Sequence, residues 1–190
     1  MVKSNVFRFS IKDIAEISIL TALAIILDTF VKIPFALTGG SLNICAVPLI
    51  IISLRHGSFK GFIASGLLFG LITCLIDGYG LITYPLEYLV AFGSIGLFGF
   101  IAKYVNNHLS DKKLNIILLL VLFTFLWATI RFFAASIDSH IIYEYDWIAS
   151  FGYNLTYVYP SAALDLIIVI ALVLTTFPAI KKFKTSYLSE

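Results

Sequence analysis

Four ionisable residues interrupt the long apolar stretches of this sequence, each in a different stretch: Asp28, Glu87, Arg131 and Asp165. A charged side chain at the centre of a bilayer costs about 2.5–3.5 kcal/mol on insertion scales, so such residues mark candidate functional sites. Three structural interpretations remain open, and in one of them Glu87 is a structural acid whose hydrogen bonds are satisfied within the protein. Arg131 and Asp165 could form an ion pair between helices, and Asp28 could be solvated at the membrane interface. The pattern nevertheless favours a polar pocket.

Aromatic residues accompany these charges. Tyr88 directly follows Glu87, and Tyr79 lies in the preceding run Asp77-Gly78-Tyr79-Gly80. The later segment 138–159 is rich in rings and acids, namely Tyr143, Glu144, Tyr145, Asp146, Trp147, Phe151, Tyr153, Tyr157 and Tyr159. A carboxylate among rings attracts a planar cation, because a desolvated cation–π contact is worth about 2 kcal/mol. The amide of Asn154 can add directional hydrogen bonds. An ordinary aromatic belt at the membrane surface is the alternative for some of these rings.

The motifs of common enzyme classes are missing from the sequence. It contains neither a G-x-x-x-x-G-K-[ST] phosphate loop nor an H-E-x-x-H zinc motif. His56, His108 and His140 all fall in predicted loops, away from any serine at membrane depth. Cys45 and Cys74 lie in apolar stretches without metal-ligand spacing, as buried thiols do. We therefore expect no catalytic residue, no metal site and no cofactor, and we interpret the chain as a binding protein.

Composition indicates where these residues must be positioned. Of the 190 residues, 60% are hydrophobic and 13% are charged, and the mean hydropathy is +0.99. An average soluble domain carries about 25% charged residues. This composition excludes a disordered chain, a nucleic-acid-binding protein and most soluble enzymes. It predicts one integral membrane domain that covers residues 1–190.

Six apolar segments are candidates for membrane-spanning helices, each of which needs about 20 residues. They cover residues 14–33, 44–54, 59–76, 84–104, 114–135 and 157–180. The second is short and contains Pro48, so it would be a tilted or broken helix sheltered by its neighbours. The predicted fold is therefore all-α, an integral bundle of six transmembrane helices.

Basic residues give this bundle an orientation. Eleven of the thirteen Lys and Arg residues fall on one side of the six spans: Lys3, Arg8, Lys12, Arg55, Lys60, Lys103, Lys112, Lys113, Lys181, Lys182 and Lys184. Because basic residues mark the cytoplasmic side, both termini are predicted to be cytoplasmic. Asp28, Glu87, Arg131 and Asp165 then all lie toward the outer side. The predicted pocket consequently opens to the exterior.

Small residues four positions apart indicate close helix packing. Gly66 and Gly70 have this spacing in the third span, and Ser18 and Ala22 have it in the first. Packing inside the bundle and contact with a partner protein are both open. Gly93 and Gly96 are interpreted as packing positions rather than as part of a nucleophile motif.

Four stretches together resemble the thiamine-specific S components, the substrate-binding subunits of energy-coupling factor (ECF) vitamin transporters. The first is Gly39-Gly40-Ser41-Leu42-Asn43-Ile44-Cys45-Ala46-Val47-Pro48-Leu49, with Ser53-Leu54-Arg55-His56-Gly57 after it. The second is Tyr84-Pro85-Leu86-Glu87-Tyr88-Leu89-Val90-Ala91-Phe92-Gly93, and the third is Arg131-Phe132-Phe133. The fourth is Tyr153-Asn154 with Tyr157 and Pro160. They follow the family's order and spacing over nearly the whole chain.

The resemblance implies a function for particular residues. Glu87 would pair with a cationic ligand, Tyr88 would stack on it, and Asn154 would bond its aminopyrimidine. Tyr143 stands where the family often has Trp and would stack in its place. Tyr79, Tyr153 and Tyr157 complete the expected ligand-binding set. The protein would be a multi-pass protein of the bacterial plasma membrane.

The resemblance also implies partners. Ser18 and Ala22 match the small-residue motif through which such subunits dock on a transmembrane coupling protein. That protein joins two cytosolic ATPase subunits, which drive uptake of thiamine or a related cationic heterocycle.

One departure keeps the substrate open. The thiamine-specific family commonly has His four residues after the fifth-helix Arg, where this chain has Ala135. Asp138 or His140 could supply the ligand hydrogen bond that the usual His would make. Another planar vitamin or a thiamine precursor therefore remains an alternative substrate. A stand-alone secondary transporter, or a membrane enzyme that uses Asp28, Asp165 or Glu87 as acid or base, remains an alternative function.

Overall fold

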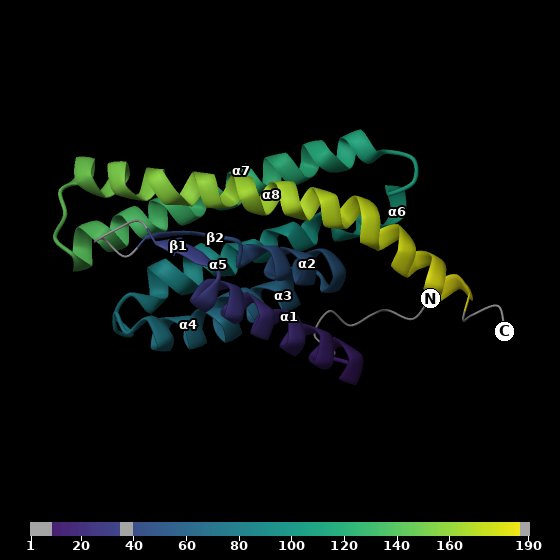
Figure 1. The fold of residues 1–190 in the computed structure, drawn as a ribbon, viewed down its shortest axis with the longest axis horizontal. Helices are drawn as coiled ribbons and strands as arrows, with labels where there is room; N and C mark the ends of the chain where they lie inside the picture. Colours follow the sequence, from purple (N-terminus) through teal and green to yellow (C-terminus); the bar gives the residue numbers. More distant parts are fainter. Residues whose placement is uncertain (1–8, 35–39, 187–190) are drawn as a thin grey trace.

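The computed structural model describes residues 9–34 and 40–186, with side chains up to residue 178. The fold is an elongated bundle, 83% helical, whose long helices run along one axis (Figure 1). Lys3, Arg8 and Gly39 lie outside the described residues, and the side chains of Lys181, Lys182 and Lys184 are likewise outside them. The position of both termini therefore stays a prediction.

Helical segments occupy all six predicted places. They are α1 (Ile11–Phe30), α2 (Ala46–His56), α3 (Ser58–Phe62), η1 (Ile63–Phe69), α4 (Gly70–Asp77), η2 (Tyr84–Val90), α5 (Ala91–Gly93), η3 (Ser94–Phe100), α6 (Ala102–His108), α7 (Lys113–Ile142) and α8 (Trp147–Ser186). The segments η1 and η2 are π-helical and η3 is a 3₁₀-helix. Segments α3, η1 and α4 join into one continuous helix, and η2, α5 and η3 form a second.

Three of these helices are long and apolar enough to cross a membrane: Ser58–Asp77, Lys113–Ile142 and Trp147–Pro178. A fourth span is possible if Tyr84–Phe100 and Ala102–His108, bent by 42° at their junction, count together. The first and second predicted spans correspond to α1 and to the short apolar helix α2. The described part thus confirms an α-helical membrane architecture, and the count of six spans stays a prediction.

Some predicted helix ends are wrong. Helix α7 extends to Ile142 rather than 135, and α8 begins at Trp147 rather than 157. Most of segment 138–159, expected as an outer loop, is therefore helical. The carboxylate of Asp146 accepts a hydrogen bond from the Ala149 backbone N–H at 2.7 Å and so caps the early start of α8. His56, His108 and His140 lie in the last turns of α2, α6 and α7, not in loops.

The structure also contains a small two-stranded sheet, which the all-α prediction did not include. Strands β1 (Lys32–Pro34) and β2 (Ser41–Asn43) pair antiparallel, with Lys32 opposite Asn43 and Pro34 opposite Ser41. The pair follows directly on α1 and leads into α2 (Figure 1). It brings polar residues of both strands to the end of α1.

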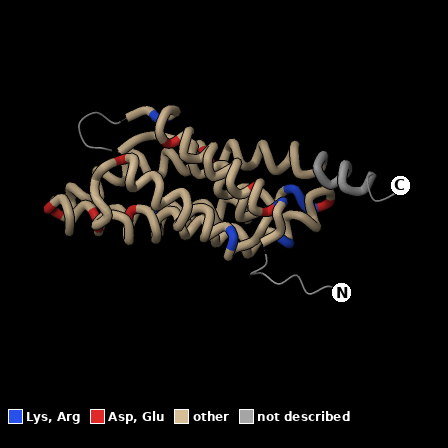
Figure 2. Tube along the Cα trace, turned by 90° about the horizontal axis from the view of Figure 1, so that it is seen from below, with Lys and Arg blue, Asp and Glu red and all other residues tan. Residues whose placement is uncertain are grey.

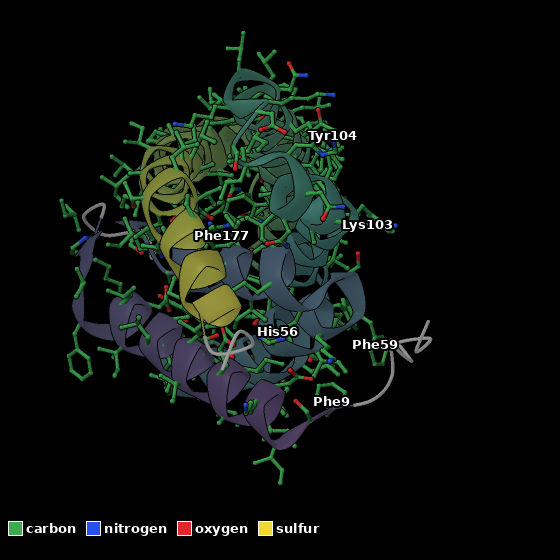
Figure 3. The ribbon with its side chains drawn as sticks, turned by 90° about the vertical axis from the view of Figure 1, so that its right-hand side faces the viewer. Phe9, His56, Phe59, Lys103, Tyr104 and Phe177 are labelled. Carbon is green, nitrogen blue, oxygen red and sulfur yellow. The ribbon has the colours of Figure 1, made fainter. Side chains whose placement is uncertain are left out.

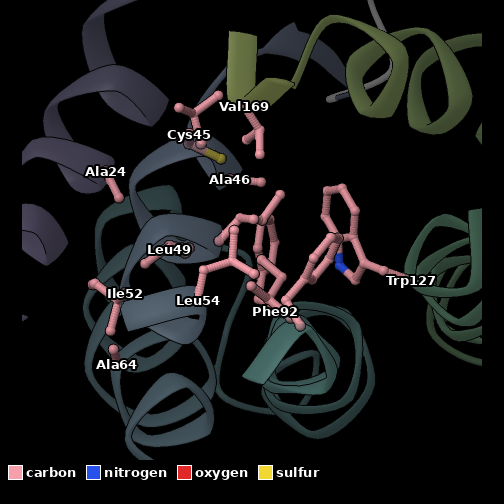
Figure 4. Close-up of a cluster of buried hydrophobic side chains, with 14 of the residues drawn as sticks. Ala24, Cys45, Ala46, Leu49, Ile52, Leu54, Ala64, Phe92, Trp127 and Val169 are labelled. Carbon is pink, nitrogen blue, oxygen red and sulfur yellow. The ribbon is translucent and has the colours of Figure 1, made fainter. Parts of the chain in front are cut away.

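Helix α2 lies in the centre of the bundle, as its short length and Pro48 led us to expect. It contacts α1, α3, η3 and α8, and most of its residues are buried. Figure 4 shows Leu49, Ile52 and Leu54 of this helix packed toward Ala64 and Phe92 from neighbouring segments. The surrounding helices shelter α2 from lipid, which a helix too short to span the bilayer alone requires.

Glycines bring the third and fourth helical passes into close contact. A Cβ atom on Gly66 would lie 3.0 Å from the Cα of Gly93, and one on Gly70 would lie 3.2 Å from the Cβ of Tyr88. A Cβ on Gly96 would lie 2.9 Å from the carbonyl oxygen of Ser58. The packing interpretation of these glycines is therefore confirmed, and the contact lies inside the bundle.

Charges are distributed unevenly along the bundle. Helix α6 and the start of α1 lie toward one end of the bundle (Figure 1). In Figure 2 acidic residues predominate at the opposite end, and basic residues gather toward the end with α6 and the start of α1. There Lys60 bonds Asp13 at 2.7 Å, and Arg55 pairs with Glu16. Hydrogen bonding by Lys60 lowers the pKa of Asp13 to about 2. Figure 3 views this end and labels His56, which lies within 3.5 Å of Asp13 and ties α2 to α1.

Candidate ligand-binding site

A cavity of about 340 Å³ lies at the acidic end of the bundle. Its walls come from α1, both strands, α4, η2, α5, α7 and α8, and from the links 78–83 and 143–146. Six of the seven predicted ligand-binding residues line it: Tyr79, Glu87, Tyr88, Tyr143, Tyr153 and Tyr157. The structure thus brings together residues that lie far apart in the sequence.

Four carboxylates and two basic groups line this cavity, so its formal charge is negative. Two of the carboxylates are already partnered. Asp28 accepts a hydrogen bond from the Asn43 amide at 2.9 Å. Asp77 accepts one from the Tyr88 hydroxyl at 2.8 Å and lies 3.6 Å from the ammonium of Lys32. Asp28 is only 8% exposed, so its interpretation as a solvated interfacial residue is wrong.

Glu87 stands in the first turn of η2 with its carboxylate at the cavity wall. No described residue donates a hydrogen bond to it or forms an ion pair with it. Glu87 of η2 and Phe92 of the following segment α5 both line the cavity. An acid to which no described residue is bonded therefore shares the cavity wall with an aromatic ring.

Aromatic rings surround the carboxylates. Tyr88 stacks on Phe92, with centroids 6.4 Å apart and planes 23° apart. Tyr79 and Tyr143 meet edge to face at the mouth, with centroids at 6.4 Å. Burial, followed by the charges of Asp138 and Glu87, raises the pKa of Tyr143 to about 12, so its phenol stays neutral at physiological pH. Flat faces beside negative charge suit a planar cation.

Arg131 contributes a buried positive charge to the wall. Its guanidinium lies over Phe92 at 4.7 Å, Trp127 at 5.8 Å and Tyr157 at 6.0 Å from the ring centroids. Among the described residues it forms no ion pair with Asp165, so the predicted alternative of a structural pair is wrong. Asp165 is fully buried and does not line the cavity.

Asn154 is the one predicted ligand-binding residue outside the cavity lining. Its amide donates to the Ser139 hydroxyl at 3.0 Å and to the Ser150 carbonyl at 2.8 Å. Its oxygen accepts the Tyr157 hydroxyl at 2.6 Å. Direct contact with a ligand stays a prediction, since the structure uses this amide to hold two residues of the wall, Ser139 and Tyr157.

Several lining residues were not in the predicted ligand-binding set. They are Asp28, Lys32, Gly40, Ser41, Asn43, Asp77, Phe92, Arg131, Asp138, Ser139 and Tyr145. A signal for Asp138 was available, because it follows Arg131 by seven residues and two turns place both on one helix face. Ser41 and Asn43 of β2 lie in the first stretch of the family resemblance, but neither a charge nor a ring marked them as cavity residues.

The structure shows the surroundings of Ala135, which stands where the thiamine-specific family usually has His. Ala135 is buried and does not line the cavity. Of the two residues that could compensate, Asp138 lines the cavity. His140 instead lies 2.7 Å from the Tyr145 carbonyl oxygen and stacks on Trp147. In the described part of the chain, no group of three His, Cys, Asp or Glu side chains is arranged to hold a metal ion.

Ser18 and Ala22 do not line this cavity. Both are exposed on α1, whereas Ile17, Thr21, Ala24 and Asp28 form its buried side. Their docking role stays a prediction.

These features define a class: a helical membrane protein with an acidic, aromatic cavity at one end of its bundle. Comparison with known proteins gives the family. Residues 14–181 match the family model described as Thiamine transporter protein (Thia_YuaJ). The chain is 34% identical over 185 residues to thiamine transporter ThiT of Bacillus subtilis (strain 168), covering 89% of this chain and 94% of that protein. The chain belongs to the thiamine transporter family.

A solved structure of ThiT from Listeria monocytogenes has the same fold. It aligns with a TM-score of 0.75 at 20% identity and covers 87% of this chain and 94% of its own. Family and apolar helices together make the chain a multi-pass bacterial membrane protein.

Proposed function

We propose that this protein is the substrate-binding S component of an ECF-type importer and that its ligand is thiamine. The observation that carries the proposal is the unpartnered Glu87 carboxylate beside the Tyr88 and Phe92 rings in a cavity of about 340 Å³. Thiamine is a cation with two planar rings joined by a methylene group; its charge suits the acid and each ring suits an aromatic face. Family membership supports the same ligand.

The coupling to partners is proposed from the sequence resemblance and from α1. In this scheme the chain captures thiamine on the outer side. A transmembrane coupling protein then binds the exposed face of α1 that carries Ser18 and Ala22. Two cytosolic ATPase subunits supply the energy, because this chain has no phosphate-binding loop of the P-loop type.

The test is equilibrium binding of thiamine to the purified chain, measured by isothermal titration calorimetry. The wild type should bind one thiamine per chain. Glu87→Gln removes the charge with little change of shape, and it should raise the Kd by about tenfold or more, because charge-assisted hydrogen bonds are worth about 1.5–3 kcal/mol.

Glu144→Gln is the matched control. Glu144 is an exposed acid of the same link that carries Tyr143, but it does not line the cavity. Its substitution makes the same change in net charge and should alter the Kd by less than about twofold. The proposal is wrong if the wild type binds no thiamine. It is also wrong if Glu87→Gln binds thiamine as tightly as Glu144→Gln does.

A further inference from the structure

Asp138, like Glu87, is an acid of the cavity for which the described residues provide no hydrogen bond and no ion pair. It lies on α7, across from η2 and Glu87, and its side chain is nearly enclosed, with 2% exposure. Its Oδ1 atom is buried without a hydrogen-bond partner. A buried carboxylate without hydrogen bonds or a counter-charge is costly. A group that is absent from the unliganded chain would remove this cost.

The charges around Asp138 indicate the sign of that missing group. Ion pairs in the described part involve Asp13, Glu16 and Asp77, and none includes Asp138. Arg131 acts electrostatically on Glu87 and Asp28. The charged group that acts on Asp138 is Glu87, which has the same sign. No described basic group forms an ion pair with Asp138, and Glu87, an acid of the same cavity lining, repels its charge. A cation held in the cavity would therefore be attracted to both acids.

We propose that Asp138 is a second substrate-binding carboxylate, and that it and Glu87 together hold the positive centre of the ligand between α7 and η2. This assignment rests on the proposed function and adds a residue to its site. A cation between two acids of like charge gains attraction from both and relieves their mutual repulsion. The second acid also makes the cavity discriminate against neutral analogues and against ligands that carry phosphate.

The rings near Asp138 support this position for the ligand. Tyr143 follows Asp138 by five residues, and the charges of both Asp138 and Glu87 act on its phenol. Ser139, the next residue, also lines the cavity and is fixed by the Asn154 amide. Helix α7 and the residue that follows it thus contribute an acid, a hydroxyl and a ring to the cavity lining.

The experiment compares thiamine with 3-deazathiamine, a neutral analogue of nearly the same shape, on wild type, Asp138→Asn and Glu144→Gln. Asp138→Asn should raise the Kd for thiamine by about tenfold or more. The same variant should change the Kd for the neutral analogue by less than about threefold, because that ligand has no charge to lose contact with. The control should change neither Kd by more than about twofold.

Two results would overturn the assignment. Wild-type affinity for thiamine in Asp138→Asn would do so, and so would an equal loss for both ligands, which indicates a role in cavity shape alone. If Asp138→Asn does not fold, as judged by thermal unfolding, Asp138→Ser takes its place with the same expected difference. A wild type that fails to bind thiamine contradicts the proposed function itself, whereas an unaffected variant contradicts only the role of Asp138.

Discussion

The acids of the cavity differ in what the protein provides for them. Asp28 and Asp77 receive hydrogen bonds from Asn43 and Tyr88 at 2.9 and 2.8 Å. Glu87 and Asp138 receive none from the described residues. Partnered acids help to fix the walls, and unpartnered acids leave acceptor capacity for a ligand. The residues that we propose to recognise the ligand are thus distinguished by their contacts rather than by residue type.

Tyr157 gives a prediction at this scale. Its hydroxyl donates to the Asn154 oxygen at 2.6 Å in a buried position, and its ring lies beside Arg131. Tyr157→Phe removes the hydroxyl and leaves a buried amide oxygen unsatisfied. The free energy of unfolding should fall by about 1–3 kcal/mol, as measured by denaturant titration in detergent.

Thr156→Val is the neighbouring control. Within the described part of the chain, the Thr156 hydroxyl bonds the Tyr153 carbonyl alone, on the exposed side of the same helix, so its loss should cost less than about 0.5 kcal/mol. Equal stability of Tyr157→Phe and wild type would show that the Asn154 network does not support the cavity wall.

Sequence reasoning identified the aromatic and acidic residues of the site better than their partners. Glu87 and the tyrosines were recognisable because a charge or ring cluster stands out in an apolar chain. Asn43 was not, because its contact with Asp28 depends on how β1 and β2 fold over α1. Asn154 was recognised, but its three hydrogen bonds within the protein could not be read from spacing.

The close pairing of two helical passes positions η2 and therefore Glu87. Gly66 and Gly93 let the backbones approach, and the Tyr84 hydroxyl bonds the Gly66 carbonyl at 3.1 Å across the same contact. On the other side of η2, the Trp127 indole donates to the Ala91 carbonyl at 3.0 Å and ties α5 to α7. The cavity wall that carries Glu87 is held from both sides.

Gly66→Leu tests this packing. A side chain there would meet the Gly93 backbone and Leu89, and the helices would have to separate. Overpacking of this kind costs about 1–3 kcal/mol, so the thermal unfolding midpoint should fall and thiamine binding should weaken with it.

Gly152→Ala is the control, because a side chain at Gly152 would meet no neighbouring atom. A Cβ atom at Gly152 meets nothing within 4 Å, and the residue lies inside α8. Alanine should raise the free energy of unfolding by about 0.5–1 kcal/mol through helix propensity. A Gly66→Leu protein as stable as wild type would contradict the packing account.

Helices were predictable from hydropathy, but their ends were not. Hydropathy follows the apolar part of a helix, whereas α7 and α8 continue into polar turns beyond it. Those polar turns carry Asp138 and Tyr153, both in the cavity lining. The strands β1 and β2 are too short for a periodic signal. The functional end of the bundle was consequently the part that sequence patterns described least well.

The two ends of the molecule differ in charge and in the groups they carry. The acidic cavity lies at one end, and the basic residues and the α1–α2 ion pairs lie nearer the other (Figure 2). Many large apolar side chains between them are exposed, as lipid contact requires, including Ile19, Leu75, Leu122 and Ile167. Capture of a ligand and contact with partner proteins can therefore use different surfaces.

Ala22→Trp tests the proposed partner surface. Ala22 is exposed on α1 and does not line the cavity, so thiamine binding should be unchanged. A bulky ring should keep a partner helix from approaching closely, and ATP-driven uptake by the assembled transporter in proteoliposomes should fall about fivefold or more.

Leu122→Trp places the same ring on an exposed position of α7 and should leave uptake intact. Normal uptake by Ala22→Trp would exclude this face of α1 as the docking surface. Uptake by the chain alone, without ATPase subunits, would instead favour a stand-alone transporter.

The most direct measurement of the central claim is an experimental structure of the protein with thiamine bound. The account predicts thiamine in the cavity between η2 and α7, with a carboxylate oxygen of Glu87 or Asp138 within about 4 Å of the positively charged ring nitrogen, the distance of an ion pair. Thiamine bound elsewhere, or a Glu87 side chain directed at lipid, would contradict it.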